Sequence, residues 1–294
     1  MSKVTLHLVD GTYELFRAYF AVPSQVGATG QEVGATRGLI QTLLSLLSRS
    51  DVTHVACAFD HVIESFRNQL FAGYKTSEGI PHELFSQFEL AERATRALGI
   101  VTWPMIDFEA DDALATAAAR FGGDERVERV VVCSPDKDLL QCVEGTRIVS
   151  WDRQRDKLYD EAAVVEKLGV LPRQVPDFLA LVGDTADGIP GVPRWGKASA
   201  ARVLAQCGSL EQIPQTAKEL GVSLRGADSL IASLNTLRPE AALYKVLATL
   251  RRDVPLAESL EELEYKGSPR AELSAFLVEI GAQTLEARVP RFRD

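Results

Sequence analysis

Acidic residues follow three short apolar runs of the chain. Asp10 and Asp60 each come directly after such a run, and Asp136 and Asp138 come shortly after a third. Runs of this length and composition predict buried β-strands. In open α/β sheets, ligand sites gather beyond the carboxyl ends of the strands. If the three strands are neighbours, we expect these aspartates to meet at one edge of a sheet.

Two further groups of acids stand at spacings of three residues. Glu109 and Asp112 share one face of a predicted helix, and Asp111 lies in the same first turn, where the helix dipole favours negative charge. Asp184 and Asp187 are also three residues apart, in a segment so rich in glycine and proline that it must be a loop. With the aspartates at strand ends, the sequence offers nine candidate carboxylates.

Carboxylates brought together repel one another, so some of them must protonate or find cations. Lysine or arginine could pair with some, and any single aspartate at a strand end is more often a turn former or helix cap than a ligand. Clustered carboxylate oxygens are also what Mg²⁺ requires, and two such ions can clamp the attacking and leaving oxygens of a phosphodiester. No histidine or cysteine stands at ligand spacing. The set of acids, more than any one of them, favours a Mg²⁺ site.

The segment LVDGT superficially resembles the motif of haloacid-dehalogenase phosphatases. That chemistry needs a nucleophilic aspartate two residues before the second aspartate, and Leu8 stands at that position. The sequence therefore excludes this covalent route.

The composition is that of a globular protein. The 294 residues are 46% hydrophobic and 25% charged, and no apolar stretch approaches the roughly 20 residues that span a bilayer. The net charge of −9 counts against a generally basic nucleic-acid-binding surface, but the nine candidate carboxylates account for the whole excess. The chain starts without a signal peptide, and its four cysteines are far apart, so we expect a cytoplasmic protein.

The first half of the chain alternates strand-like and helical segments. Strands are predicted at 4–9, 55–59, 100–103, 130–133 and 147–151, and helices at 36–48, 91–98 and 110–120. This alternation predicts an α/β fold, with a mostly parallel sheet flanked by helices. Beyond about residue 160, helices are predicted at 162–168, 175–182, 197–206, 210–219, 224–237 and 240–250. We therefore expect an α/β domain over 1–165 and a helical region over 166–294.

Five motifs, in this order and spacing, resemble the 5′-nuclease family of flap endonucleases and 5′–3′ exonucleases, which includes the exonuclease domain of bacterial DNA polymerase I. They are VDGTYELFRAYFA (9–21), AFD (58–60) with FRNQLFAGYK (66–75), DFEADDALA (107–115), SPDKDLLQ (134–141) and GDTADGIPGVPRWGKASA (183–200). The resemblance implies a PIN-like α/β domain, an arch or clamp at about 66–98, and a helix–three-turn–helix element at about 183–206. No polymerase sequence follows, so we expect a free-standing member.

The resemblance also implies the roles of individual residues. All nine carboxylates stand where the family places its metal-binding acids: Asp10, Asp60, Glu109, Asp111, Asp112, Asp136, Asp138, Asp184 and Asp187. Mg²⁺ is the implied ion, and Mn²⁺ is expected to substitute for it. Arg17 and Lys75 match basic groups that approach the scissile phosphate and neutralise its charge. Tyr74 matches a ring that can stack on a base near the cut, although ordinary core packing is an equally good interpretation.

Two positions depart from the family pattern. Glu78 stands where an arginine is usual, and a negative charge there would repel a DNA backbone. Arg194 and Trp195 replace small residues in the loop where the family binds duplex DNA through backbone N–H groups and a K⁺-like ion. We expect duplex contact to survive, with Arg194 taking over part of the ion's role, whereas Trp195 could simply fill a hydrophobic gap. The residues expected to contact DNA are Tyr74, Gly191, Arg194, Gly196, Lys197 and Ser199.

The sequence thus predicts a metal-dependent 5′–3′ exonuclease and structure-specific flap endonuclease, monomeric, acting on DNA with 5′ ends, flaps or nicks. Phosphate contacts read no base sequence, so the expected specificity is for DNA structure. Arg67, Lys137 and Arg202 are further candidates for phosphate contact, although solvated surface residues are the more common case. Two alternatives remain open, a DNA-structure binding protein with weak turnover and a PIN-type ribonuclease.

Overall fold

The computed structural model describes residues 4–293, which form two compact units. The sheet unit comprises residues 4–63, 77–134 and 252–293, and the helical unit comprises residues 64–76 and 135–251. This division differs from the boundary expected at residue 165, which followed the order of the chain. Within residues 4–293, no helix is both long and apolar enough to cross a membrane.

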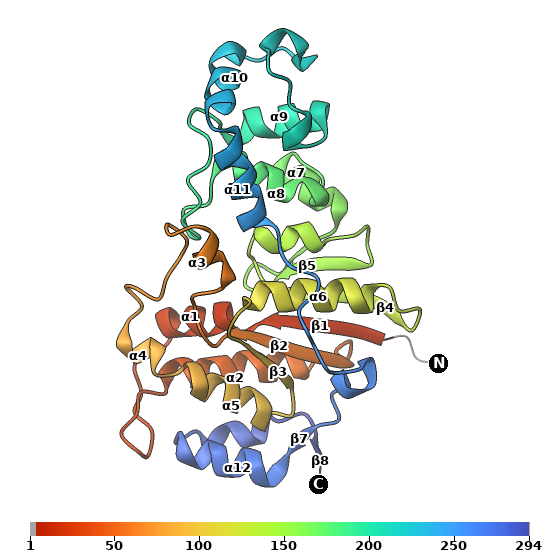
Figure 1. Ribbon diagram of the computed structural model, residues 1–294. Coiled ribbons are helices and arrows are strands. Elements are labelled where there is room, and N and C mark those ends of the chain that lie inside the picture. The colour runs from red at the N-terminus through yellow and green to blue at the C-terminus, as the bar shows by residue number, and fades with distance from the viewer. Residues whose placement is uncertain (1–3, 294) are drawn as a thin grey trace. The chain divides into compact units, whose positions relative to one another are not determined.

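Four parallel strands form the centre of the sheet unit (Figure 1), as the alternating pattern predicted. They are β1 (Val4–Asp10), β2 (His54–Asp60), β3 (Val101–Met105) and β4 (Val127–Cys133), in the order β3-β2-β1-β4. Asp10 lies opposite Ala58 and Val9 lies opposite Cys133 in the register of the sheet. The carboxyl ends of β1, β2 and β4 therefore share one edge of the sheet.

Helices cover both faces of these strands (Figure 1). The helices of the sheet unit are α1 (Gly11–Ala21), α2 (Gly34–Leu47), the short α4 (His82–Phe85), α5 (Phe88–Ala97), α6 (Ala110–Gly122) and α12 (Arg270–Glu279). Figure 1 shows α6 on one face, and α2 and α5 on the other. Most alanines of α6, among them Ala113 and Ala117, are buried, because small side chains let a helix approach the sheet closely.

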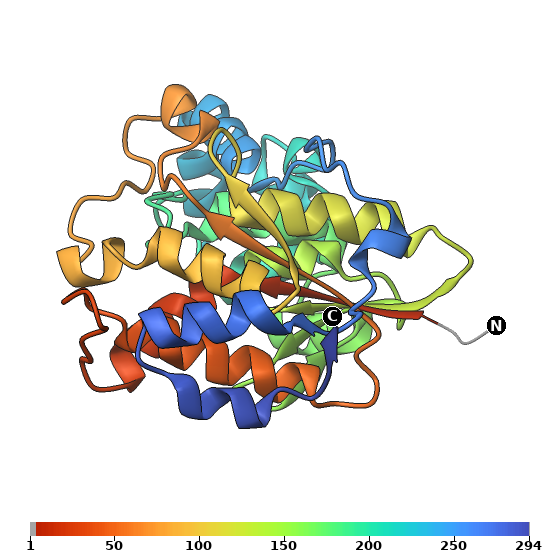
Figure 2. The same cartoon turned by 90° about the horizontal axis from the view of Figure 1, so that it is seen from below.

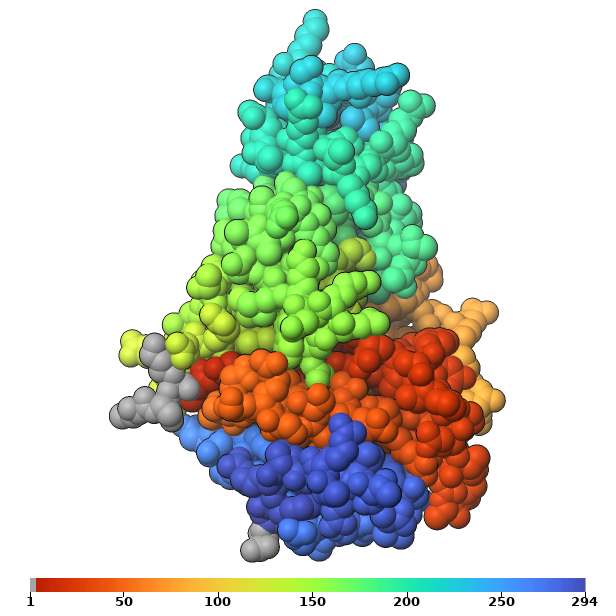
Figure 3. Space-filling view, turned by 180° about the vertical axis from the view of Figure 1, so that it is seen from behind, coloured from red at the N-terminus to blue at the C-terminus, as the bar shows by residue number. Residues whose placement is uncertain are grey.

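The end of the chain packs within the sheet unit. Figure 2 shows α12 beside α5, and Figure 3 shows the C-terminal segment in blue against the orange surface of the N-terminal part of the same unit. The Nε atom of Arg37 in α2 donates to the carbonyl of Ile280 at 2.8 Å, and two short strands pair as β7 (Ser268–Pro269) and β8 (Phe292–Arg293). A 3₁₀ segment, Gln283–Arg288, lies between α12 and β8.

The helical unit packs mainly α-helices around its own core. It contains α3 (Phe66–Leu70), α7 (Glu161–Leu168), α8 (Val175–Val182), α9 (Lys197–Cys207), α10 (Ala227–Thr236) and α11 (Arg238–Ala248), with a hairpin of β5 (Ile148–Asp152) and β6 (Lys157–Tyr159). Phe178 and Leu181 of α8 are buried in this core. The helix predicted at 210–219 is wrong. Two 3₁₀ turns, Leu210–Gln212 and Ala217–Leu220, replace it, because Pro214 between them cannot donate a helical hydrogen bond.

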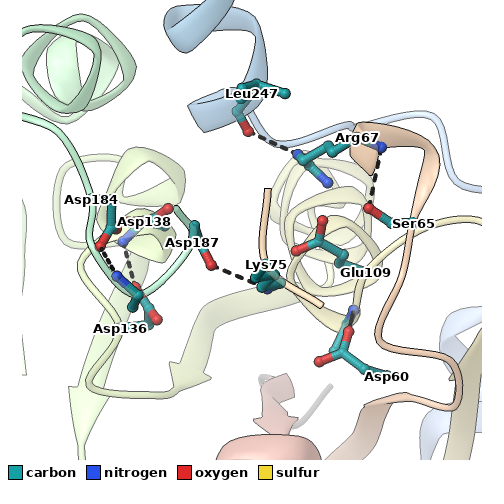
Figure 4. A network of polar contacts seen from close by, with 12 residues as sticks. Asp60, Ser65, Arg67, Lys75, Glu109, Asp136, Asp138, Asp184, Asp187 and Leu247 are labelled. Carbon is teal, nitrogen blue, oxygen red and sulfur yellow. Dashed lines mark hydrogen bonds and ion pairs between the residues drawn. The ribbon is translucent and has the colours of Figure 1, made fainter. Parts of the chain in front are cut away.

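Arg67 is among the largest fully buried side chains of the protein. Its Nε donates to the carbonyl of Leu247 at 2.8 Å (Figure 4), and its Nη2 donates to the carbonyl of Thr249 at 3.1 Å. Both carbonyls lie at the end of α11, where backbone acceptors lack helical partners and a positive charge is favourable. The interpretation of Arg67 as a surface residue or phosphate contact is therefore wrong, because it anchors α3 to α11.

We expect Arg67→Met to destabilise the protein by about 2–4 kcal/mol, because two carbonyls at the end of α11, that of Leu247 buried, lose their donor while the side-chain volume is largely kept. Chemical denaturation of the purified protein measures this loss. The matched control is Arg225→Met, which changes an exposed arginine of the same unit and should stay within about 0.5 kcal/mol of wild type. Equal stability of the two variants would contradict the assigned anchoring role.

Candidate metal centre

Asp10 ends β1 and begins α1. Its Oδ1 accepts the backbone N–H of Tyr13 at 2.8 Å, which caps the helix, and its Oδ2 accepts the hydroxyl of Ser134 at 2.9 Å. The side chain is almost completely buried. Asp10 is therefore a helix cap, as the alternative interpretation had it, and a carboxylate that caps a helix can also bind a cation, because its oxygens have several acceptor sites.

The start of α6 brings more acids of the sheet unit together. Asp60, at the end of β2, accepts the backbone N–H of Ala110 at 2.7 Å (Figure 4), and Asp112 accepts that of Glu109 at 3.0 Å. Glu109 is the N-cap of α6, and Glu109 and Asp112 are buried, whereas Asp111 is half-buried in the first turn. The positive end of the helix dipole explains why acids gather here.

A second acidic group lies in the helical unit. Carboxylate oxygens of Asp138, Asp184 and Asp187 all lie within 4.8 Å of one another. Asp138 begins the 3₁₀ turn Asp138–Cys142, and the other two lie in the loop after α8. Reciprocal backbone hydrogen bonds of 2.8 Å between Asp184 and Ile189 hold this loop in a tight turn. Asp136, which is exposed, accepts the backbone N–H of Asp138 at 2.9 Å.

Two lysines partly neutralise this group. Lys137 Nζ contacts Asp184 and lies 3.8 Å from Asp138 Oδ1, and Lys75 Nζ lies 3.3 Å from Asp187 Oδ1 (Figure 4). Burial alone would lower the pKa of Lys137, but Asp138 and Asp184 outweigh burial and raise it. The sequence analysis expected Lys137 to be a solvated surface residue or a phosphate contact and missed its pairing with these aspartates. The signal for this pairing was that Lys137 stands between two aspartates in the sequence.

Asp138 is the acid of this cluster whose ionised form is least favoured. Burial raises its pKa well above the ordinary value, and the neighbouring Asp136, Asp187 and Asp184 raise it further, against the opposing effect of Lys137. Its Oδ1 is buried and accepts no hydrogen bond from any residue in the described range.

These observations fit a divalent ion. Four aspartates face two lysines in the helical unit, which leaves an excess of negative charge. Asp138 Oδ1 is also a buried oxygen without a hydrogen-bond donor among the described residues. An all-oxygen donor set suits Mg²⁺ or Mn²⁺ rather than softer metals. Asp138, Asp184 and Asp187 are therefore the residues of this unit best arranged to hold such an ion.

Arg17 is held in place by a buried acid. Its Nε donates to Glu14 Oε2 at 2.8 Å, and its Nη2 contacts Glu14 and donates to Thr42 Oγ1 at 2.8 Å. Neither Glu14 nor Thr42 was singled out from the sequence, although an acid three residues before an arginine on a helix is a recognisable pairing signal. The two Nη1 hydrogens have no partner among residues 4–293, and 29% of the side chain is exposed.

Two residues expected to contact DNA, Tyr74 and Gly191, are buried. Tyr74 is 4% exposed and packs in the core of the helical unit, which agrees with the core-packing interpretation. Trp195 is also buried, and its indole N–H donates to the carbonyl of Leu230 at 3.0 Å, as the gap-filling interpretation predicts. At Gly191 a Cβ would lie 2.4 Å from the backbone nitrogen of Gly183, so tight backbone packing requires a glycine there.

We expect Mg²⁺ or Mn²⁺ to raise the melting temperature by roughly 5 °C at saturation, because the ion binds only the folded carboxylate cluster. Asp138→Asn should be at least as stable as wild type without metal, since it removes a buried negative charge, but should lose most of the metal-induced rise. Thermal unfolding in chelator and in each metal measures both effects.

Glu240→Gln is the control, because it removes an exposed acid of the same unit and should keep the full rise. A metal-induced rise of the same size in Asp138→Asn would show that the ion binds elsewhere.

Known families match almost the entire chain. Models of 5′–3′ exonucleases match residues 5–169, as their N-terminal resolvase-like domain, and residues 170–271, as their C-terminal SAM fold. DNA polymerase I of Pseudomonas aeruginosa is 36% identical over 281 residues, which are 92% of this chain and 30% of that protein. DNA polymerase I of Bacillus caldotenax is 34% identical over 286 residues, which are 96% of this chain and 32% of that protein. The chain thus spans about a third of the length of these relatives.

Solved structures share the fold. T5 5′-exonuclease with bound zinc ions aligns with a TM-score of 0.68 and 18% identity, covering 94% of this chain and 99% of that one. The catalytic core of Rad2 in complex with DNA substrate aligns with a TM-score of 0.63 and 14% identity, covering 98% and 92% of the two chains. The resemblance seen in the five motifs is confirmed by the consecutive domain matches, and the chain belongs to the 5′–3′ exonuclease family, whose members are nucleases that act on DNA.

Proposed function

We propose that this protein hydrolyses DNA phosphodiesters with divalent ions, as a 5′–3′ exonuclease and flap endonuclease acting at 5′ ends, flaps and nicks. The observation that carries this proposal is the buried cluster of Asp138, Asp184 and Asp187, whose oxygens lie within 4.8 Å of one another and include one with no hydrogen-bond partner in the described residues. Family membership supplies the reaction class, and the all-carboxylate donor set supplies the choice of Mg²⁺, with Mn²⁺ as a substitute.

The acids of both units are the proposed metal ligands. In the sheet unit they are Asp10, Asp60, Glu109, Asp111 and Asp112, and in the helical unit they are Asp136, Asp138, Asp184 and Asp187. When bound, divalent ions at such carboxylates supply an activated water and stabilise the charge that develops on the phosphodiester. The chain's own contribution is to fix the carboxylates in advance, through backbone N–H donors such as those of Tyr13 and Ala110.

Arg17 and Lys75 are proposed to stabilise negative charge on the scissile phosphate. The bond of Arg17 to Glu14 fixes one side of the guanidinium and leaves its Nη1 hydrogens for an incoming phosphate oxygen. Lys75 pairs with Asp187, so its ammonium is already held beside the candidate metal ligands. A phosphate approaching this group would exchange one anionic partner of Lys75 for another.

Lys75 owes its position to a close backbone approach. Its N–H donates to the carbonyl of Asp187 at 3.0 Å, and Asn68 Nδ2 donates to the carbonyl of Lys75 at 2.9 Å. Gly188 makes this approach possible, because a Cβ there would lie 2.1 Å from the carbonyl oxygen of Gly73. Its φ of +74° also favours glycine.

DNA is the proposed substrate because the solved neighbours include complexes with DNA, among them a flap endonuclease of bacteriophage T5 with DNA and metal ions. In this chain, Lys197 is exposed at the start of α9, and neither a carboxylate nor any other group in residues 4–293 pairs with it. Gly196 leaves open space at the same helix N-terminus, where backbone N–H groups favour phosphate. Ser199 bonds to Gly196 and completes this end of the helix.

We expect the protein to cleave a duplex with a 5′ single-stranded flap in Mg²⁺, and to lose cleavage in chelator. Asp138→Asn should lower kcat by about 100-fold or more, because an essential charge of the ligand set is removed, whereas Glu240→Gln should cleave at the wild-type rate. Gel-resolved cleavage of end-labelled DNA measures these rates.

The same assay separates the alternatives. Preference for an RNA flap over a DNA flap would favour the ribonuclease, and tight flap binding in Ca²⁺ with negligible cleavage in Mg²⁺ would favour a binding protein. Either result would overturn the proposed activity.

We expect Gly188→Ala to lower the cleavage rate by about tenfold or more, because the added Cβ forces Gly73 and Lys75 away from Asp187. Gly226→Ala is the matched control. Gly226 has a nearly identical φ of +73°, but a Cβ there meets nothing within 4 Å. The control should therefore carry the same backbone strain and keep the wild-type rate; equal losses in both variants would leave strain, not the displaced lysine, as the cause.

A further inference from the structure

Arg194 adopts a backbone conformation that residues with side chains rarely use. Its φ is +75°, and among residues 4–293 the only other non-glycine residue with a positive φ is Asp156. The neighbouring Trp195 fixes this turn, because its indole is buried and bonded to the carbonyl of Leu230. A strained residue held by its surroundings points to a function of its side chain.

The side chain of Arg194 stands at an open cavity of about 520 Å³. Hydroxyl groups line much of this cavity, from Ser229, Ser233 and Thr236 of α10. Arg194 is exposed, and no acid within the described part of the chain pairs with it. Lys197, three residues later, is in the same state. The loop before α9 therefore presents uncompensated positive charge, although the protein as a whole is acidic.

A monovalent cation, which the family resemblance implies for this loop, does not fit it here. Such an ion needs several backbone carbonyl oxygens directed at one point. In this turn the carbonyl of Val192 accepts the N–H of Trp195 at 3.1 Å, and that of Pro193 accepts the hydroxyl of Ser233 at 2.7 Å. The carbonyl of Gly196 accepts the hydroxyl of Ser199 at 2.8 Å. Each of these oxygens still has a second lone pair, so the hydrogen bonds compete with an ion for the carbonyls, and the charge of Arg194 decides against the ion.

The charge of Arg194 adds to this mismatch. A guanidinium carried by the same turn repels a second cation, and it remains charged at every accessible pH. The strained backbone at Arg194 therefore introduces a permanent cation where a glycine would leave room for an ion.

We infer that Arg194 is the fixed cation through which this loop binds a phosphate of duplex DNA, in place of a bound K⁺. The inference rests on the proposed function and goes beyond it. If Arg194 replaces the ion, the affinity of this protein for duplex DNA does not depend on which monovalent cation is present. Arg194 itself is then a DNA-binding residue.

The test measures duplex binding by fluorescence anisotropy in chelator, where no cleavage occurs, in equal concentrations of KCl, NaCl and LiCl. We expect wild-type Kd values that agree within about twofold among the three salts. Arg194→Met should weaken binding about 3- to 10-fold in every salt, and should lower the slope of log K against log salt by about one, since one phosphate contact is lost. Arg194→Lys should keep most of the affinity.

Arg194→Gly separates charge from strain, because glycine relieves the positive φ but also removes the guanidinium. It should bind as weakly as Arg194→Met while melting at an equal or higher temperature than wild type. Arg173→Met is the control for loss of a positive charge elsewhere, since Arg173 is an exposed arginine of the 3₁₀ turn Pro172–Gln174 in the same unit.

Wild-type binding several-fold tighter in KCl than in LiCl would overturn the inference and leave the nuclease intact. Undiminished binding by Arg194→Met would overturn it as well. Failure of wild type to bind duplex DNA in any of the salts, together with failure to cleave it, would instead reject the proposed function.

Discussion

Mutual repulsion among buried carboxylates is the constraint that organises this protein. Burial and three neighbouring aspartates all disfavour the ionised form of Asp138 and raise its pKa. Lys137 and Lys75 offset only part of this repulsion, since two ammonium groups face four carboxylates. A compact divalent charge would complete the balance, which is why we propose a metal ion at these acids.

The acids of the sheet unit are held in place by hydrogen bonds from the backbone. Asp10, Asp60 and Asp112 each accept a backbone N–H at a helix N-terminus, so they stabilise the helices that hold them. Capping and metal binding are compatible, because a carboxylate oxygen that accepts one hydrogen bond still has a lone pair. The capping role of these acids is therefore shown, and the proposed metal-binding role is compatible with it. The hydrogen bonds fix each side chain before any ion arrives, which lowers the entropy cost of binding it.

In this acidic protein, individual arginines have different roles that depend on where they lie. Arg67 is buried at the end of α11 and serves packing, whereas Arg17 is fixed by Glu14 with part of its guanidinium left for a ligand. Arg194 occupies a strained position that only a rigid neighbour such as Trp195 can maintain. Net charge thus says little about nucleic-acid binding here, because a few uncompensated cations at fixed positions set the local field.

The sequence by itself determined the parallel sheet, the full extent of α8 at Val175–Val182 and the start of α6 at Ala110. It also placed the candidate acids at strand ends, at a helix start and in a loop. These follow from local periodicity and capping, which act over a few residues. Only the tertiary structure decided that Tyr74 is buried, that Arg67 caps a distant helix, and that residues 252–293 belong to the sheet unit. Such outcomes depend on contacts between segments far apart in the chain, and a local pattern carries no information about which partner a side chain will meet.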